Sequence, residues 1–187
     1  MKRVLIAMVV SVALLSPVLA LDADSSVRRF ATYPEFQAII LPEGVGNAIG
    51  FRATLDFDVP EGKINPFIGG RAYYGKTETS SYTDNDFYGT LDAGFRLMLR
   101  DKPEAELSSL AFRVGIDLGM GYSHRVTTSS TNDYFSFIWE PTGKLEWRVR
   151  NATFCLGMSY RGIVSPESGW SYKKNAVVVD LGYFYDL

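Results

Sequence analysis

Hydrophobic and polar residues alternate along most of this chain. Leu110, Phe112 and Val114, for example, open an apolar series that is interleaved with Arg113 and Gly115. A period of two places successive side chains on opposite faces of a β-strand. Eight segments follow this pattern, at residues 31–41, 49–59, 64–77, 87–99, 110–122, 134–149, 152–164 and 177–187. The sequence therefore predicts an all-β chain of eight strands.

Two of these segments are less regular than the others. Pro34 and the apolar run 38–41 obscure the period of the first segment. Pro141 lies inside the sixth segment and has no N–H to donate to a neighbouring strand. We therefore expect a bulge or a local break in the ladder near Pro141.

The connections between the segments come in two lengths. Short turns are expected at residues 60–63 and 150–151, and longer connections rich in Ser, Thr, Asn and Asp at 77–86, 126–133 and 165–175. Residues 101–108 form a longer exception on the short side. Short inner turns that alternate with longer outer loops are typical of transmembrane β-barrels. The pattern predicts an eight-stranded antiparallel up-and-down transmembrane β-barrel with both ends of the barrel domain on one side.

The apolar face of these segments is expected to point outward, to lipid. In the second to eighth segments none of its positions is Asp, Glu, Lys or Arg. The lumen of an eight-stranded barrel is only just wide enough for its side chains, so the many aromatic residues of this face would not fit inside. Glycines gather on the opposite, polar face and leave room there for long charged side chains. The alternative is a soluble, ligand-carrying barrel with its apolar face inside.

An inward polar face would fill the lumen with charge. Acidic and basic residues occur there in similar numbers, which predicts a neutralising network of salt bridges and little room for an open channel. The candidate network consists of Arg52, Asp56, Arg71, Asp92, Arg96, Arg113, Asp117, Glu140, Lys144, Glu146, Arg148, Arg161 and Asp180.

The first twenty residues are typical of a secretory signal. Lys2 and Arg3 precede an apolar run over residues 4–15, and Ala20 closes a candidate cleavage site. We expect cleavage after Ala20 and a barrel domain over residues 21–187. The single cysteine, Cys155, suits an oxidising compartment, and a net charge of −2 makes nucleic acid an improbable partner.

The C-terminal residues carry a resemblance to known proteins. The series Asp180, Gly182, Tyr183, Tyr185 and Leu187 resembles the barrel-assembly signal of small outer-membrane barrels of the OmpA and OmpX kind, with leucine where phenylalanine is usual. The resemblance implies a monomer in the outer membrane, in contact with its lipid and lipopolysaccharide. It also implies that Gly182, Tyr185 and Leu187 are recognised by the barrel-assembly machinery.

The sequence offers few residues for chemistry. His124 is the only histidine, and a lipid A-modifying enzyme would use it near the outer rim, but Ser123 has the opposite parity and Val126 stands where such deacylases have serine. No residue spacing indicates a metal or a cofactor. Candidate loop contacts to lipopolysaccharide or a host surface are Trp170, Tyr172, Lys173 and Lys174. We therefore expect a structural, envelope-integrity or adhesion role and no enzyme; a lipid A-modifying enzyme and a narrow solute channel are the alternatives.

Overall fold

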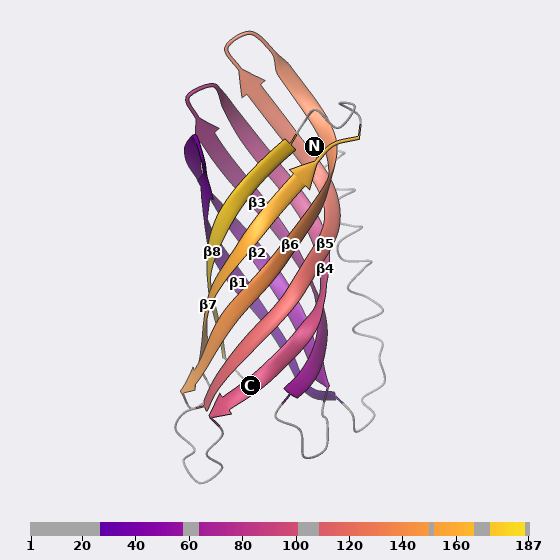
Figure 1. Cartoon of the computed structure of the whole chain (residues 1–187), viewed down its shortest axis with the longest axis vertical. Coiled ribbons are helices and arrows are strands. Elements are labelled where there is room, and N and C mark those ends of the chain that lie inside the picture. The colour runs from indigo at the N-terminus through magenta and orange to yellow at the C-terminus, as the bar shows by residue number, and fades with distance from the viewer. Residues whose placement is uncertain (1–26, 58–63, 101–108, 150–151, 167–172, 186–187) are drawn as a thin grey trace.

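The computed structural model describes residues 27–57, 64–100, 109–149, 152–166 and 173–185. They form eight antiparallel strands: β1 (Val27–Leu41), β2 (Gly44–Phe57), β3 (Ile64–Thr79), β4 (Tyr82–Arg100), β5 (Ser109–Thr127), β6 (Thr131–Val149), β7 (Ala152–Val164) and β8 (Lys173–Tyr185). Each strand pairs with its neighbours in sequence, and β1 pairs with β8 to close the barrel (Figure 1). The predicted closed, eight-stranded, antiparallel up-and-down barrel is confirmed. Within the described ranges, no helix has the length and apolar composition needed to cross a membrane.

The strands are strongly tilted, because their pairing is staggered around the barrel. Following directly paired residues once around leads from Ile64 back to β3 at Tyr74, ten residues further along. This stagger is the shear of the barrel, and it sets strand tilt and lumen width together. The full path is Ile64, Leu97, Phe112, Leu145, Leu156, Leu181, Phe36, Ile49 and Tyr74, and every member is apolar.

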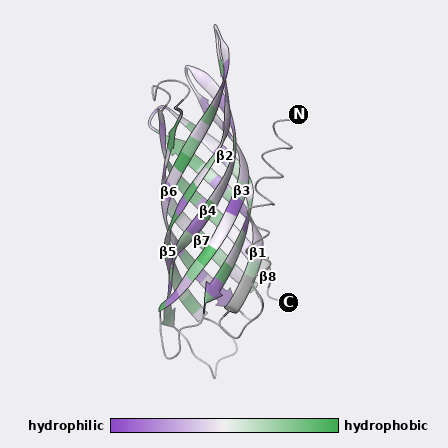
Figure 2. Ribbon diagram, turned by 90° about the vertical axis from the view of Figure 1, so that its right-hand side faces the viewer, coloured by the Kyte–Doolittle hydropathy of each residue, from purple (hydrophilic) through white to green (hydrophobic). Residues whose placement is uncertain are grey.

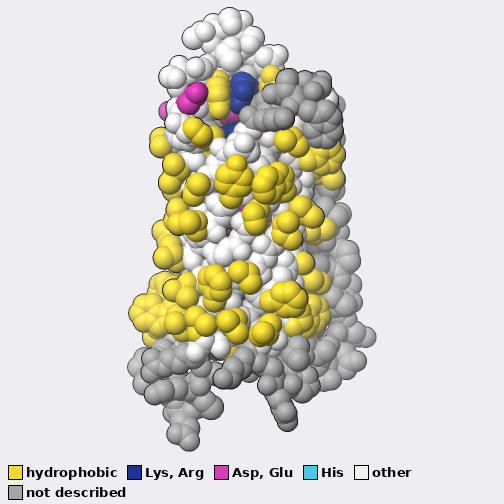
Figure 3. All heavy atoms as spheres, in the orientation of Figure 1, with side chains coloured by type: hydrophobic (Ala, Val, Ile, Leu, Met, Phe, Trp, Pro, Cys, Tyr) yellow, Lys and Arg dark blue, Asp and Glu magenta, His cyan; other side chains and the backbone are white. Residues whose placement is uncertain are grey.

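The distribution of side chains is the reverse of that in a soluble protein. Phe95 and Met158 expose 56% and 62% of their surface on the outside, whereas Glu35 and Glu140 are fully buried within the barrel. Hydropathy alternates along the ribbons in Figure 2. Apolar side chains are spread around the wall in Figure 3, where the coloured charges gather near one end. The apolar face therefore points outward.

The outer ends of the central strands are longer than the sequence predicts. β3 and β4 continue to a turn at residues 80–81, and β5 and β6 to a turn at 128–130, so the long loops expected at 77–86 and 126–133 are mostly strand. The side chains of Thr79 and Thr127 accept hydrogen bonds from the backbone N–H groups that follow them and close these turns. In Figure 1 the β5–β6 hairpin projects furthest. Both faces of these ends are polar, so hydropathy alone does not separate them from loops.

Other strands also begin earlier than predicted, and β2 begins at Gly44, five residues before its predicted start. β1 begins at Val27, four residues before the predicted start, and β8 begins at Lys173, inside the connection expected at residues 165–175. The β6–β7 ladder lacks pairs between Trp139–Gly162 and Thr142–Ser159, which is the break expected at Pro141, without a change of register. The predicted short turns at 60–63 and 150–151 and the connection at 101–108 lie outside the described residues.

Candidate functional site: the charged lumen

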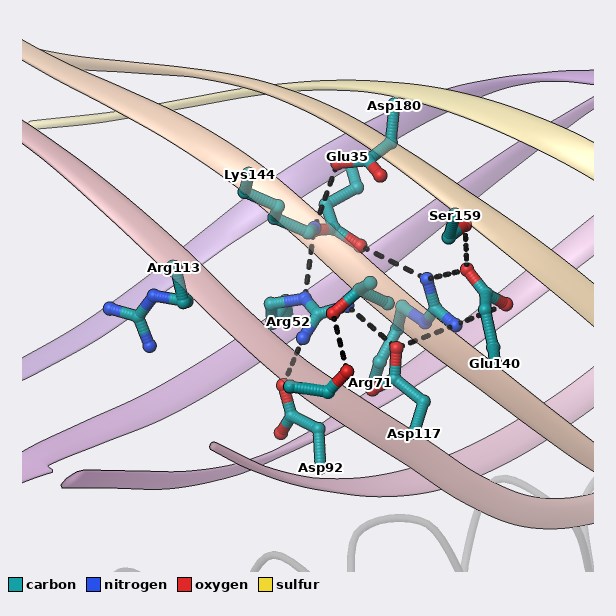
Figure 4. Close-up of polar contacts among 12 residues, drawn as sticks. Glu35, Arg52, Arg71, Asp92, Arg113, Asp117, Glu140, Lys144, Ser159 and Asp180 are labelled. Carbon is teal, nitrogen blue, oxygen red and sulfur yellow. Dashed lines mark hydrogen bonds and ion pairs between the residues drawn. The ribbon is translucent and has the colours of Figure 1, made fainter. Parts of the chain in front are cut away.

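Arg52 is the hub of the ion pairs inside the barrel (Figure 4). Its side chain projects from β2, and its Nε donates to Glu35 Oε1 on β1 at 2.8 Å. Its two terminal nitrogens contact Asp92 on β4 and Asp117 on β5, the latter at 3.3 Å. All four side chains are almost fully buried. One guanidinium thus connects carboxylates from three other strands.

A second group of ion pairs continues from this hub across the lumen. Arg71 Nη2 lies 2.9 Å from Glu140 Oε2 and 3.3 Å from Asp117 Oδ2. Glu140 also accepts hydrogen bonds from Arg161 Nε at 2.6 Å and from Ser159 Oγ at 2.6 Å. Glu140 is therefore held by three donors from two strands, which fixes its position in the centre of the barrel.

Lysine and the remaining acids complete the set, which we call the main network. Lys144 contacts Glu35 and lies 2.8 Å from Asp180 Oδ1. Towards the other end of the strands, Glu146 accepts hydrogen bonds from Arg113 at 2.9 Å and Arg96 at 2.7 Å. The main network consists of Glu35, Arg52, Asp56, Arg71, Asp92, Arg96, Arg113, Asp117, Glu140, Lys144, Glu146, Arg161 and Asp180, all buried.

Glycines on the inner face make room for these acids. Gly69 pairs directly with Asp92, and Gly157 pairs with Asp180. A Cβ atom at either glycine would lie 2.4 Å from an oxygen of the opposite carboxylate. The carboxylates thus lie against the backbone of the neighbouring strand, where only glycine leaves enough space.

Gly157→Ala tests this packing. The added methyl group pushes the Asp180 carboxylate away from Lys144, and we expect a loss of about 1–3 kcal/mol in the free energy of unfolding. The matched control is Gly143→Ala on the outer face, where a Cβ would lie at ordinary distances of 3.4 Å from Phe112 and 4.0 Å from the carbonyl oxygen of Met158. Urea unfolding of the refolded barrel in detergent micelles measures both. Equal stability of the two variants would mean that the contact between Asp180 and Gly157 is unimportant.

Apolar side chains close the lumen on the outer side of the main network. This apolar plug consists of Ile39, Tyr73, Tyr88, Ile138, Ile163 and Val178, all buried, with Leu41, Ala48 and Ala176 packed around them. On several strands the plug residue lies two positions from a charged residue, on its outer side. Tyr73 follows Arg71 along β3, whereas Ile138 precedes Glu140 along β6, because these two strands run in opposite directions. The Arg161 guanidinium lies 4.3 Å from the centre of the Tyr73 ring. The plug thus fills the described part of the lumen at this level with buried side chains.

A second polar group, the outer cluster, lies beyond the plug. Arg125 donates two hydrogen bonds of 2.8 Å to Asp84, and Lys174 Nζ lies 2.6 Å from both Asp86 and Thr77. Ser123 Oγ donates to Asp86 at 2.7 Å. The sequence interpretation missed this cluster because it assigned these segments to loops. The residues of the cluster continue the inward-facing positions of their strands, and this parity was the signal that could have revealed the cluster.

Tyr82 and Arg125 cover the outer cluster. The Arg125 guanidinium lies 3.6 Å from the centre of the Tyr82 ring. Burial raises the pKa of Tyr82, Asp84 raises it further, and Arg125 opposes the shift. The Asp84 and Asp86 side chains are buried.

Of the four candidate loop contacts, Lys174 alone has a described side chain. Lys174, expected in the last outer loop, lies in β8 with its side chain buried, so it is not a surface contact. Lys174 occupies an inward-facing position of β8, because this strand begins earlier than predicted. Trp170 and Tyr172 lie outside the described residues, as does the side chain of Lys173. Arg148, placed in the lumen network from its parity, is exposed near the start of the β6–β7 connection.

The expected assembly signal is described in part. Gly182 lies in β8 and faces inward, where a Cβ would lie 2.9 Å from the Tyr33 ring. Tyr185 is the last residue of β8, its side chain is not described, and Leu187 lies outside the described residues. Recognition by the assembly machinery therefore stays a prediction.

His124 lies on the outer face of β5, away from the lumen. Its Nδ1 lies 2.7 Å from Asp133 Oδ1 on β6, and both side chains are about half exposed. The neighbouring Ser123 points inward, to Tyr88 and Asp86. Ser123 and His124 thus lie on opposite faces of one strand and cannot act as nucleophile and base together. In the parts of the chain that the structure describes, no three acidic, histidine or cysteine side chains are grouped to hold a metal ion.

Comparisons with known proteins add little to this geometry. No protein-family model matches the chain, and no curated protein matches it. Among solved structures, it is similar to Ail, the attachment invasion locus protein of Yersinia pestis, at 12% identity and a TM-score of 0.47 over 83% of this chain and 95% of that one. It is also similar to Neisserial surface protein A, at 11% identity and a TM-score of 0.47 over 82% and 93% of the two chains. The functional assignment therefore rests on the geometry of this chain.

Proposed function

We propose that this protein is a transmembrane β-barrel of an outer membrane. The observation that carries the proposal is the inverted distribution of side chains: a charged, ion-paired interior inside an exposed apolar wall. A membrane-spanning barrel must satisfy its backbone between strands and present an apolar band to lipid. Export through a signal cleaved after Ala20 belongs to the same proposal, and residues 1–26 lie outside the described part of the chain.

The outer boundary of the membrane is marked on β3–β6 by two neighbouring rows of side chains. Tyr74, Phe87, Tyr122 and Phe135 pair directly across the four strands and form an outer aromatic row. Two residues further out, Lys76, Asn85, His124 and Asp133 form an outer polar row in the same way. Aromatic girdles lie at the edges of the lipid-facing band of such barrels. The strand ends beyond the polar row then lie outside the membrane.

Within this class, we propose a rigid, non-conducting anchor that displays the β3–β4 and β5–β6 hairpins at the cell surface. The main network and the apolar plug fill the lumen, which argues against a solute channel. The hairpin ends are rich in hydroxyl side chains such as Ser80, Ser129 and Thr131, which suit contacts with polar surfaces. An envelope-integrity or adhesion role follows from this display, in a monomer surrounded by outer-membrane lipid and lipopolysaccharide. Catalysis by His124 is not part of the proposal, since its hydrogen-bond partner is Asp133 and not a nucleophile.

Cysteine labelling of intact cells tests the display. Ser129→Cys at the tip of the β5–β6 hairpin should react with a membrane-impermeant maleimide in intact cells. Ala152→Cys, at the other end of the barrel, should react only after the outer membrane is permeabilised. The native Cys155 is buried, and its labelling in the unsubstituted protein is the background for both variants. Reaction of Ser129→Cys only after permeabilisation, or recovery of the protein in the soluble periplasmic fraction, would overturn the proposal.

A further inference from the structure

A groove crosses the outer wall of the barrel near the end opposite the hairpins. It has a volume of about 400 Å³, and two rows of large, outward-pointing apolar side chains form its sides. The first row lies on β6, β7 and β8 and consists of Trp147, Phe154 and Tyr183, paired directly across the strands. The second row extends onto β1 and consists of Leu145, Leu156, Leu181 and Phe36, paired in the same way. The groove is therefore part of the apolar wall.

The groove is long and narrow. Its two rows lie two residues apart along each strand, which is about 6.6 Å, whereas its length spans three strand spacings, about 14 Å. In the first row, the centre of the Phe154 ring lies 6.3 Å from that of Trp147 and 5.2 Å from that of Tyr183, so the rings pack against one another. The floor is the directly paired Cys155 and Gly182, whose side-chain positions face the lumen. The bottom of the groove is therefore backbone, without a side chain to fill it.

The groove leads from the inner end of the wall towards its middle. Directly paired residues climb outward in the order β6, β7, β8 and β1, because the path around the barrel that begins at Ile64 returns to β3 at Tyr74, ten residues further along. The β6 end of the groove is therefore nearest the inner end, beside Trp147, which lies two residues before the end of β6. The β1 end, at Phe36, lies further outward. Tryptophan is favoured at membrane–water boundaries. The groove thus begins at the expected inner boundary and runs obliquely into the lipid-facing band.

We propose that this groove binds one acyl chain of a phospholipid whose headgroup lies at the inner boundary of the membrane, near Trp147. The inference rests on the proposed membrane function, because the wall must face lipid. The described residues that line the groove include no charged side chain, and Phe154 and Leu181 expose 48% and 56% of their surface. Lipid is as apolar as the groove, so binding comes from van der Waals packing. A chain in the groove is contacted by two rows and a floor, whereas a chain on a flat wall is contacted from one side.

Native mass spectrometry tests the proposal. The refolded barrel in detergent micelles is mixed with palmitoyl-oleoyl phosphatidylethanolamine, and we expect a species with one bound phospholipid that survives removal of the micelle. Leu181→Trp narrows the groove and should lose this species. Leu91→Trp is the matched control, because it makes the same exchange at an exposed position of β4, away from the groove, and should keep it. If Leu181→Trp does not refold, Phe154→Ala, which removes the middle of the first row, makes the same test. A wild type without bound phospholipid, or equal retention by the groove variant and the control, overturns the proposal.

The same spectra separate this proposal from other occupants and from the membrane function itself. A dimer that Leu181→Trp abolishes would assign the groove to a second copy of the chain, and preferred retention of lipid A would assign it to a lipid of the other leaflet. Either result overturns the proposal. A barrel that inserts into phosphatidylethanolamine-containing vesicles but retains no phospholipid in the spectrum contradicts this inference alone. A wild type that folds in plain buffer contradicts the proposed membrane function as well.

Discussion

Arg52→Met is expected to reduce the free energy of unfolding by about 3–5 kcal/mol, the usual cost of removing one partner from a buried ion pair. Arg52 is fully buried and contacts Glu35, Asp92 and Asp117. Methionine fills part of the same volume but supplies no positive charge. The three acids would lose their shared donor while their own side chains stay almost fully buried. Urea unfolding in detergent micelles, followed by tryptophan fluorescence, measures the loss.

Two further variants test whether the loss of stability in Arg52→Met comes from its buried ion pairs. Lys76→Met removes a lysine whose salt bridge to Glu78 is exposed at the outer rim, and it should leave the unfolding midpoint unchanged. Arg52→Lys keeps one charge but loses the planar fork that reaches three acids, so its stability should fall between the wild type and Arg52→Met. Wild-type stability of Arg52→Met would show that the lumen is hydrated enough to solvate the released carboxylates.

The alternation of the sequence predicted the barrel because it is a local signal. Period two assigns every side chain of β4 and β5 to one face or the other without knowledge of which strands pair. Charge on one face and bulky apolar residues on the other then indicate which face is inside. This reasoning placed Arg113, Asp117 and Arg96 on the inner face, where the structure buries them.

The partners within the lumen could not be predicted in the same way. Arg52 on β2 reaches Asp117 on β5, and Lys144 on β6 reaches Glu35 on β1. These contacts cross the lumen between strands that are not neighbours, so they depend on the stagger of ten residues around the barrel. The stagger follows from all eight registers together, and no single segment contains it. Pairing across the lumen is therefore a global property, although parity is a local one.

The apolar plug and the outer strand ends were missed for different reasons. Ile39 and Ile138 lie on the inner face of strands whose outer face is also apolar, so they do not stand out in a hydropathy pattern. The hairpin ends beyond the outer polar row carry mostly polar residues on both faces, so the alternation of hydropathy disappears there although pairing continues. Pairs such as Thr83–Val126 and Val126–Thr131 show that the ladder extends well past the last aromatic row.

The largest effect on membrane insertion is expected from a charge in the middle of the apolar wall. Ile116 lies on β5, exposes 44% of its surface, and is flanked by Leu118 on the same strand and by Ala93 and Pro141 on the neighbouring strands. It lies halfway between the start of the apolar series at Leu110 and the outer aromatic row at Tyr122. Arginine at the midplane of such a barrel costs about 2–4 kcal/mol, because it carries charge into hydrocarbon. Ile116→Arg should therefore refold poorly into lipid vesicles and unfold at lower urea concentration.

The matched control lies on the same face of the same strand. Val126 is exposed and lies four residues beyond Tyr122, past the outer polar row. Val126→Arg should cost only about 0–1 kcal/mol, the value for positions near or beyond the interface. In a soluble barrel both positions would face water, and both arginines would be tolerated equally. A difference between the two variants in vesicles thus measures lipid contact at Ile116, whereas equal stability, or folding of the wild type in plain buffer, would show that the apolar wall does not face a membrane.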